Sequence, residues 1–423
     1  MFCLENLPDV AADAAFALIE QYKADSSPHK VDLSPGFYRD EQAKPWTLPS
    51  VQQVLFNSSS KQICTNNDQA ERALFEDPSR DHEHLPLLGH EQLLSKARDL
   101  IFGLPLDQSA SIASIQTIAG TGANHLGALL LAQACRSQTV WISDPSWINH
   151  TEIWKIVDDG IQRRSYPYFD PERFTIDFDG MLSTLGTGAR EGDVVILHGC
   201  AHNPTGIDLD KAQWREIAAL CEKKRLIPFF DVAYQGFASG DLNGDAWPIR
   251  HFYRNTSVEI LVAQSFSKNF GLYGQRVGVL HVACRTETAR EKTVRTLTRL
   301  SRAEITSCPI HGAQIVARIL SEENLARQWQ DDLLHMSQRM LRMRTRLVSE
   351  LQRLQTPGSW EHILTDVGMF SMTGLLPEQI EELREQHHVY LLPSGRISIT
   401  GLTGHNVGYV AKSFHSALVD YGT

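Results

Sequence analysis

The stretch SFSKNFGLYGQR at residues 265–276 says most about the fold and chemistry of this chain. Two serines precede Lys268, a glycine-containing loop follows it, and Arg276 lies eight positions further on. A lysine that forms a Schiff base with a cofactor aldehyde needs a confined site, with donors for the cofactor's phosphate nearby. Ser265 and Arg276 could be those donors. Taken alone, the stretch fits a lysine on the protein surface equally well.

Two motifs upstream of Lys268 change that balance. They are AHNPTG at residues 201–206 and DVAYQG at residues 231–236. In this order and spacing the three motifs resemble the aspartate aminotransferase family, fold-type I enzymes that use pyridoxal phosphate (PLP). The resemblance extends from about Val31 to Arg396 and beyond, which is nearly the whole chain.

The composition is that of an ordinary globular protein. Of 423 residues, 42% are apolar and 21% are charged, and this length suffices for one large and one small domain. The formal charge of −10 has no basic stripe to offset it, so we do not expect a nucleic-acid partner.

The sequence also shows no pattern typical of a targeting signal, a membrane span or a metal site. The start MFCLE is not a basic region followed by an apolar run, and no stretch has the roughly 20 apolar residues of a membrane span. The seven cysteines are scattered without a C-x-x-C pair, which argues against a disulfide framework and a zinc site. These observations predict a cytoplasmic protein with no membrane partner and no metal.

Strand and helix patterns alternate from about residue 112 onward, as they do in α/β proteins. The pattern predicts a mostly parallel sheet covered by helices on both faces, and the resemblance implies seven strands. Apolar runs of strand length occur at 115–119, 139–143, 194–198, 226–231, 260–264 and 277–282, and helical periodicity occurs at 123–136, 148–159 and 210–224.

The character of the chain changes after Pro309. We expect a large PLP-binding domain at 46–325 and a small α+β domain at 326–423, which the N-terminal segment 1–45 joins as in the family resembled. Helices are predicted at 311–320, 323–354 and 406–421, and short strands at 369–373, 389–392 and 396–400.

The central chemistry is expected from Lys268, Asp231 and Tyr234. The resemblance gives Lys268 the Schiff base and, once an amino acid has displaced it, the proton transfer between Cα and C4′. It places the Asp231 carboxylate against the pyridine nitrogen, which stays protonated there. Tyr234 and Asn203 would hydrogen-bond the cofactor's phenolic oxygen. A helix cap at Asp231 and a purely structural Asn203 are the alternatives.

The position of these residues along the chain supports the same interpretation. Asn203, Asp231 and Lys268 each lie at or just after the end of an expected strand. In open α/β sheets, ligands bind outside the carboxyl ends of the strands.

The cofactor's phosphate is expected where the strand at 115–119 meets the next helix. Free amides and the positive end of the helix dipole make such a junction suitable for an anion. The resemblance closes this site with further donors, one of which, His84, reaches across a dimer interface; the alternative is that His84 points to solvent. The residues expected around the phosphate are Gly120, Thr121, Gly122, Ser265, Arg276 and His84.

Two arginines are expected to select the substrate. By the resemblance, Arg396 clamps the α-carboxylate with two parallel hydrogen bonds, and Arg302 reaches the distal carboxylate from the neighbouring subunit. Together they imply a dicarboxylic amino acid and a homodimer with shared active sites, whereas a solvated Arg302 is the alternative. Trp147 is expected to stack on the cofactor ring unless it is a core residue, with His150 behind Asp231. The other residues expected near substrate are Gly36, Trp147 and Asn203.

Four departures from the family pattern surround this machinery. Ala119 stands where a serine is usual, and His84 stands where a tyrosine is usual. SPGFY at 34–38 replaces Gly-Val-Gly-Ala-Tyr, and Pro35 removes an amide donor from that loop. TSCP at 306–309 replaces Ser-Asn-Pro-Pro. These changes leave open whether the substrate or the reaction has changed.

The main hypothesis is a PLP-dependent aminotransferase that moves an amino group between aspartate or glutamate and a 2-oxo acid by a ping-pong mechanism through a Lys268 aldimine. The strongest alternative is a related PLP enzyme that performs β-elimination, replacement or carbon–carbon bond formation. The intact Lys268, Asp231 and Tyr234 argue against a non-catalytic protein on this fold. A nicotinamide dehydrogenase lacks its G-x-G-x-x-G fingerprint here.

Overall fold

The computed structural model describes residue 7 and residues 13–56, 83–104, 111–133 and 135–420. The chain divides into two compact units. The domain limit expected at residue 325 stays a prediction; helix α13 (Glu323–Arg353) runs continuously through that position. Unit 1 consists of Met1–Pro45, Met340–Thr365 and Met369–Thr423, and unit 2 of Trp46–Arg339 and Asp366–Gly368.

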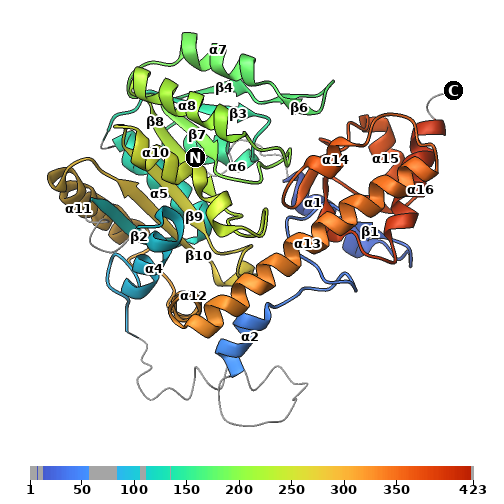
Figure 1. Cartoon of the computed structure of the whole chain (residues 1–423), viewed down its shortest axis with the longest axis horizontal. Coiled ribbons are helices and arrows are strands. Elements are labelled where there is room, and N and C mark those ends of the chain that lie inside the picture. The colour runs from blue at the N-terminus through green and yellow to red at the C-terminus, as the bar shows by residue number, and fades with distance from the viewer. Residues whose placement is uncertain (1–6, 8–12, 57–82, 105–110, 134, 421–423) are drawn as a thin grey trace. The chain divides into compact units, whose positions relative to one another are not determined.

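A seven-stranded sheet forms the centre of unit 2 (Figure 1). The neighbours β9, β8, β7, β3 and β4 pair in parallel, and β10 runs antiparallel to both β9 and β2. The mostly parallel α/β sheet predicted from the sequence is therefore confirmed. In spatial order the strands are β2 (Ile112–Ile118), β10 (Val277–Ala283), β9 (Ile260–Ser265), β8 (Ile227–Val232), β7 (Val194–His198), β3 (Thr139–Asp144) and β4 (Gln162–Pro167).

Alternate residues of each central strand enter two separate hydrophobic cores. In β7, Val195 and Leu197 pack into one core, and Val194 and Ile196 pack into the other. Because both faces of the strand are buried, the sequence there is a continuous apolar run. The first core includes residues of α4 (Glu91–Phe102), α7 (Phe178–Gly188), α8 (Lys211–Lys224) and α10 (Trp247–Asn255), and the second includes residues of α5 (Ala119–Gln133), α6 (Ile148–Val157) and α11 (Glu287–Glu304).

The other elements of unit 2 are helices and one strand pair. They are the helices α2 (Pro49–Phe56), α9 (Leu242–Asp245), α12 (His311–Ser321) and η4 (Tyr273–Gln275), the part of α13 up to Arg339, and the paired strands β5 (Phe169–Asp170) and β6 (Thr175–Ile176).

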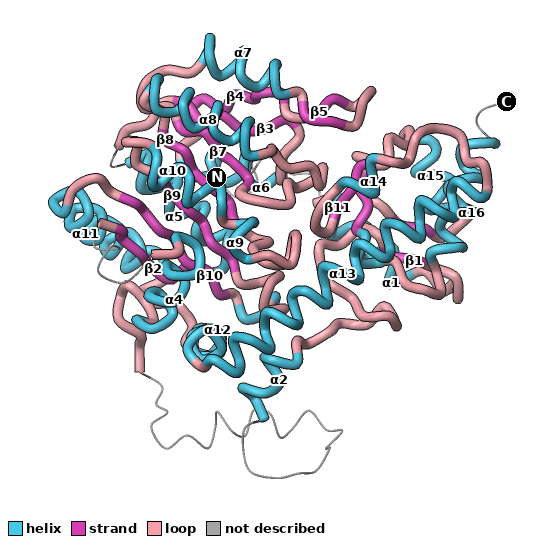
Figure 2. Tube along the Cα trace, in the orientation of Figure 1, coloured by secondary structure: helices cyan, strands magenta, loops and turns pink. Residues whose placement is uncertain are grey.

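Unit 1 combines very short strands with longer helices (Figure 2). Strand β1 (Val31–Asp32) pairs in parallel with β12 (Val389–Tyr390), so the N-terminal segment is hydrogen-bonded to the C-terminal part of the chain. Strand β11 (Phe370–Met372) pairs antiparallel with β13 (Arg396–Ser398). The helices are α1 (Ala14–Ala24), the part of α13 from Met340 onward, α14 (His362–Thr365), α15 (Pro377–Glu385), η5 (Ile399–Gly401) and α16 (Val407–Asp420).

Among the described residues, no helix combines the length and the apolar character that crossing a membrane requires.

Candidate active site

The carboxyl ends of four parallel strands bring the expected site residues of unit 2 to one edge of the sheet. Trp147 follows β3, Asn203 follows β7, Asp231 lies one residue before the end of β8, and Lys268 follows β9. These strands are consecutive neighbours, in the order β9-β8-β7-β3. Because parallel strands all end at the same edge, this edge is where a ligand site is built in such folds.

Asp231 is a largely inaccessible carboxylate that its surroundings keep ionised. Its Oδ2 lies 3.0 Å from His150 Nε2, and its side chain is 11% exposed. Burial raises the pKa of Asp231, but the His150 hydrogen bond and the electrostatic interactions with His150, His198 and Lys268 outweigh it and hold the pKa below the usual value. A group with a permanent negative charge at this depth suits a cationic partner such as a protonated ring nitrogen.

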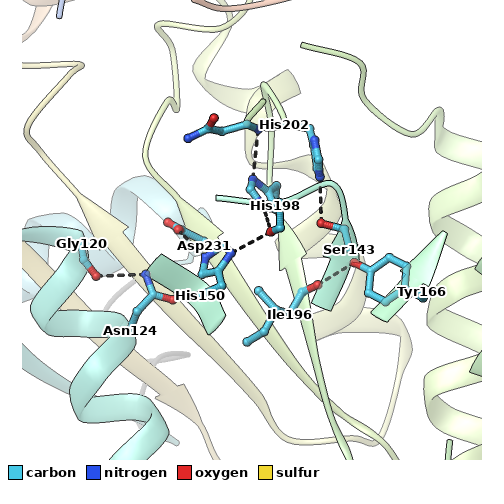
Figure 3. A network of polar contacts seen from close by, with 11 residues as sticks. Gly120, Asn124, Ser143, His150, Tyr166, Ile196, His198, His202 and Asp231 are labelled. Atoms are coloured by element: carbon cyan, nitrogen blue, oxygen red, sulfur yellow. Dashed lines mark hydrogen bonds and ion pairs between the residues drawn. The ribbon is translucent and has the colours of Figure 1, made fainter. Parts of the chain in front are cut away.

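A chain of polar contacts extends from Asp231 to the turn that carries Asn203 (Figure 3). His150 Nδ1 lies 3.0 Å from Ser146 Oγ, which in turn lies 3.2 Å from His198 Nε2. The backbone N–H of Asn203 donates to His198 Nδ1 at 3.2 Å. The network thus ties the strand that carries Asp231 to the turn after β7.

His198 is held in its neutral form within this network. Burial lowers the pKa of His198 well below its usual value, and the electrostatic interactions with His202 and His150 act in the same direction. Since Nδ1 accepts the Asn203 N–H, the ring hydrogen of neutral His198 lies on Nε2 and points to Ser146 Oγ. Neither Ser146 nor His198 was predicted as a site residue; the histidine at the end of the strand 194–198 was the available signal.

Lys268 projects from a loop whose backbone is fixed by buried side chains. Phe266 and Phe270 are both fully buried, and their rings meet edge to face at 5.5 Å. Gly271 N donates to Lys268 O at 3.0 Å. The lysine itself is half-buried, and its Nζ lies 5.3 Å from the ring centroid of Tyr234. Two of the three residues expected to do the chemistry are therefore neighbours.

Tyr234 lies at the start of a turn that a second buried carboxylate organises. Asp245 Oδ2 accepts the N–H of Gly236 at 2.7 Å, and its Oδ1 accepts the hydroxyl of Ser239 at 2.6 Å. Tyr234 O accepts the N–H of Ala238 at 2.9 Å within the same turn. Burial raises the pKa of Asp245 to about 7. Asp245 was not predicted from the sequence, because no pattern in the chain links it to Gly236.

Helix α5 begins earlier than the sequence predicted. The helix was expected to begin at Ala123, but it begins at Ala119, so that Gly120, Thr121 and Gly122 form its first turn. Ala119 has φ 55°, and its N–H donates to Arg276 O at 3.2 Å. A Cβ on Gly278 would lie 2.5 Å from the Ala119 carbonyl carbon. The close approach that this glycine permits lets the chain leave β2 directly into the helix.

The residues expected around a phosphate, apart from His84, lie together at this helix N-terminus. A Cβ on Gly120 would lie 3.0 Å from Ser265 Cβ, so the serine is next to the first turn of α5. Arg276 Nη1 donates to Tyr273 O at 3.0 Å and lies 3.4 Å from Ser267 Oγ. Amides at the start of a 15-residue helix, serine hydroxyls and a guanidinium are the donor set that a phosphate requires.

Trp147 and Asn203 complete the expected cofactor residues at this edge. Trp147 precedes the first residue of α6 and is partly exposed, and its ring meets the ring of His150 edge to face at 5.3 Å. Asn203 is 9% exposed. A half-exposed indole next to the partner of Asp231 could cover a planar ring bound there.

His84 and Arg302 lie on the surface of unit 2. Arg302 is in the last turn of α11, and both side chains are exposed. His84 Nδ1 lies 3.3 Å from Ser307 Oγ. Two of the departures from the family pattern, His84 and the stretch 306–309, are therefore in contact with each other.

Arg396 and Gly36 belong to unit 1, where both lie against Phe370. The Arg396 guanidinium carbon is 4.1 Å from the Phe370 ring centroid, and Nη2 donates to Ser34 O at 2.7 Å. A Cβ on Gly36 would lie 3.1 Å from Phe370 Cζ, so a larger residue there would press on this ring.

The known proteins that this chain resembles in sequence are aminotransferases. The family model "Aminotransferase class I and II" matches residues 28–414. The chain is 44% identical to an L-tyrosine:2-oxoglutarate aminotransferase of Aspergillus ustus, over 98% of this chain and 78% of that protein. It is 40% identical to the cytoplasmic aspartate aminotransferase of Schizosaccharomyces pombe, over 98% and 97% of the two chains.

Solved structures of similar proteins have the same fold. The aspartate aminotransferase from Saccharomyces cerevisiae cytoplasm matches with a TM-score of 0.92 and 38% identity, over 99% of each chain. An aromatic-amino-acid aminotransferase from Burkholderia pseudomallei, covalently bound to pyridoxal phosphate, matches with a TM-score of 0.91 and 33% identity, over 99% of this chain and all of that one.

Proposed function

Because the chain belongs to the class I and II aminotransferase family, we propose that aspartate or glutamate is its amino donor and a 2-oxo acid its acceptor, in a ping-pong sequence of two half-reactions. The protein is a transaminase that moves amino groups between amino acids and 2-oxo acids, and its cofactor is PLP. What we propose is the choice of substrate and the role of each residue.

The observation that carries the proposal is the ionised, buried Asp231 at the same sheet edge as Lys268. A carboxylate that stays charged at this depth fits a protonated pyridine nitrogen. The fully anchored loop around Lys268 fits a lysine that must meet a cofactor atom in one position. The donors at the start of α5 fit the phosphate of the same molecule.

In the proposed mechanism, each side chain has one task. When bound, PLP supplies an aldehyde that takes up the amino group and an electron-poor ring that stabilises negative charge at the substrate Cα. Asp231 holds a proton on the ring nitrogen, and His150 keeps Asp231 charged and oriented. Lys268 Nζ removes the proton from the substrate Cα and delivers it to the C4′ atom.

The remaining cofactor residues bind and orient. Tyr234 and Asn203 donate hydrogen bonds to the phenolic oxygen, and Trp147 covers one face of the ring. The phosphate is held by Gly120, Thr121, Gly122, Ser265 and Arg276, with His84 supplied by a second subunit.

Substrate recognition is assigned to two arginines. Arg396 binds the α-carboxylate, with Gly36 in the loop beside it, and Arg302 of a second subunit binds the distal carboxylate. This assignment requires a homodimer with shared active sites. The relatives from two yeasts are named cytoplasmic, which supports the same location for this protein.

A tyrosine donor is the second candidate. It is favoured by the name of the Aspergillus ustus relative, an L-tyrosine:2-oxoglutarate aminotransferase at 44% identity. The changed stretch 306–309, close to Arg302 in the chain, is compatible with an altered response to the substrate side chain. A change of reaction, to β-elimination, replacement or carbon–carbon bond formation, would require loss of amino transfer with both donors.

The donor half-reaction distinguishes these candidates. Purified protein is mixed with aspartate or tyrosine, without a 2-oxo acid, and the change in cofactor absorbance is followed. We expect conversion with aspartate and, in Arg302→Leu, a loss of rate with aspartate that exceeds the loss with tyrosine. Equal losses with both donors would contradict the role of Arg302. Failure to form glutamate from 2-oxoglutarate with either donor would contradict the proposed reaction.

A further inference from the structure

Asp32, in unit 1, has no role in the function described so far. Its Oδ1 accepts the hydroxyl hydrogen of Ser34 at 2.7 Å and also the backbone N–H of Ser34 at 3.1 Å. Ser34 is 1% exposed, so these bonds are formed away from solvent. Burial raises the pKa of Asp32, while the Ser34 bonds and the charge of Arg39 oppose the rise. Asp32 thus fixes the conformation of Ser34.

The backbone before Ser34 is held from two sides. Leu33 N donates to Tyr390 O at 2.8 Å, and Ser398 N donates to Leu33 O at 2.7 Å. These bonds continue the pairing of β1 with β12 and connect the segment to the end of β13. With Leu33 fixed, the two bonds to Asp32 determine the direction of the Ser34 carbonyl.

The Ser34 carbonyl is a hydrogen-bond acceptor for Arg396. Arg396 Nη2 donates to it at 2.7 Å. In the β11–β13 pair, Arg396 lies opposite Met372 and diagonal to Phe370, on the same face of the ladder, and the guanidinium carbon is 4.1 Å from the Phe370 ring centroid. The hydrogen bond to Ser34 O sets the rotation of the Arg396 guanidinium plane, and the Phe370 ring limits how closely the guanidinium can approach the β11–β13 pair.

We propose that Asp32 is a positioning residue for substrate binding: through Ser34, it holds the Arg396 guanidinium in the orientation that receives the substrate α-carboxylate. This inference rests on the proposed role of Arg396. A bidentate bond to a carboxylate needs the planar fork of the guanidinium in one orientation. An arginine already fixed in that orientation loses less side-chain freedom on binding, so affinity rises without a new contact.

The test compares two substitutions of Asp32 in the PLP-loaded enzyme. Asp32→Ala removes the acceptor, whereas Asp32→Asn removes the charge but keeps an oxygen that can accept both Ser34 bonds. The Kd of maleate, an unreactive dicarboxylate, is measured by calorimetry. We expect Asp32→Ala to raise it about three- to tenfold and Asp32→Asn to stay within about twofold of the original protein. KM for the amino donor should rise with the Kd, while kcat and PLP affinity stay unchanged.

Thr400→Val is the matched control. Thr400 Oγ1 donates to Phe37 O at 2.8 Å and lies 2.8 Å from Ser398 Oγ. This variant therefore loosens the same segment beyond Gly36 while both Ser34 bonds to Asp32 stay in place. We expect a smaller change in maleate Kd than for Asp32→Ala. Equal effects of the two variants would mean general loosening and would overturn the proposal, as would an unchanged Kd in Asp32→Ala.

Two further variants keep the result interpretable. Should Asp32→Ala not fold, Ser34→Ala removes the hydroxyl bond and leaves the backbone bond; it should raise the Kd about two- to threefold, and no change would overturn the proposal. Arg396→Ala tests the underlying assignment. If it leaves maleate binding intact, the role of Arg396 itself is wrong; if it abolishes binding while Asp32→Ala has no effect, only the role of Asp32 is wrong.

Discussion

Asp231 and Asp245 are both largely inaccessible carboxylates in unit 2, and their pKa values are shifted in opposite directions. Their side chains are nearly equally inaccessible, with Asp231 11% and Asp245 as a residue 7% exposed. The pKa of Asp231 is held below its usual value, whereas burial raises the pKa of Asp245 to about 7. Depth alone therefore does not decide whether a carboxylate keeps its charge.

The difference lies in the partners of the two groups. Asp231 accepts from His150 and lies in the field of Lys268, whereas the donors to Asp245 are the neutral Gly236 N–H and the neutral Ser239 hydroxyl. The negative charge of Asp208 raises the pKa of Asp245 further. A positive neighbour thus offsets the cost of burial, and neutral donors offset it only in part. The ionised carboxylate is the one at the proposed cofactor edge, and the other one holds the turn that carries Tyr234.

Among the predictions from this comparison, the largest effect is expected on the rate of proton removal when Asp231 loses its charge. We expect Asp231→Asn and Asp231→Ala both to slow proton removal from the substrate Cα by roughly 10³-fold, since a single electrostatic partner in an active site contributes about that much. The measurement is the single-turnover rate with aspartate. Asp245→Asn serves as the buried-carboxylate control and should keep most of its rate. Equal slowing in Asp245→Asn would mean that any buried carboxylate matters here, not the ionised one.

The second prediction concerns Asp245 and the dependence of stability on pH. The pKa of Asp245 is about 7 in the fold against an ordinary value of 3.8, so the native state holds a proton that the unfolded state releases. The bound proton stabilises the folded state. This stabilisation is fully present below about pH 4 and is lost as the pH rises through about 7. Between pH 5 and pH 8 the loss is about 3 kcal/mol.

Asp245→Asn removes this titration. The difference in free energy of unfolding between the variant and the original protein should therefore shift by about 3 kcal/mol in favour of the variant from pH 5 to pH 8. Urea unfolding at the two pH values measures it. A difference that stays constant with pH would show that Asp245 is already ionised at pH 5, as Asp231 is.

The smallest effect is expected for His84, an exposed group to which the same rule of charged partners applies. If His84 of a second subunit donates a hydrogen bond to the cofactor phosphate, His84→Ala should weaken PLP binding on the order of tenfold. The measurement is the PLP dissociation constant of the two proteins. Ser307→Ala, which removes the 3.3 Å neighbour of His84, is the control. An unchanged PLP affinity in His84→Ala would rule out the contact.

The sequence predicted those parts of the fold whose signal is local. Strand β7 begins and ends where it was expected, because the fully buried run at 194–198 lies between the polar Asp193 and Gly199. The direction of β10 could not be predicted, because a buried strand has the same apolar pattern whether it runs parallel or antiparallel. The start of α5 was placed four residues late, since it depends on the contact between Ala119 and Gly278.

The candidate site likewise has residues with a local sequence signal and residues whose contacts depend on the folded backbone. Lys268 and Asp231 could be predicted as site residues because they lie in recognisable motifs at strand ends. The bonds of Asp245 to Gly236 and of Asp32 to Ser34 were not, because polar side chains have no periodic signal and their partners follow from the folded backbone.

The most direct test of the central claim is to identify the lysine that binds the cofactor. Borohydride reduction of the PLP-loaded protein converts an amine–aldehyde adduct into a stable secondary amine, and peptide mass spectrometry then locates it. We predict that the modified peptide contains Lys268, and that Lys268→Ala, treated in the same way, has no modified lysine. A modification at another lysine, or none in the original protein, would contradict the account.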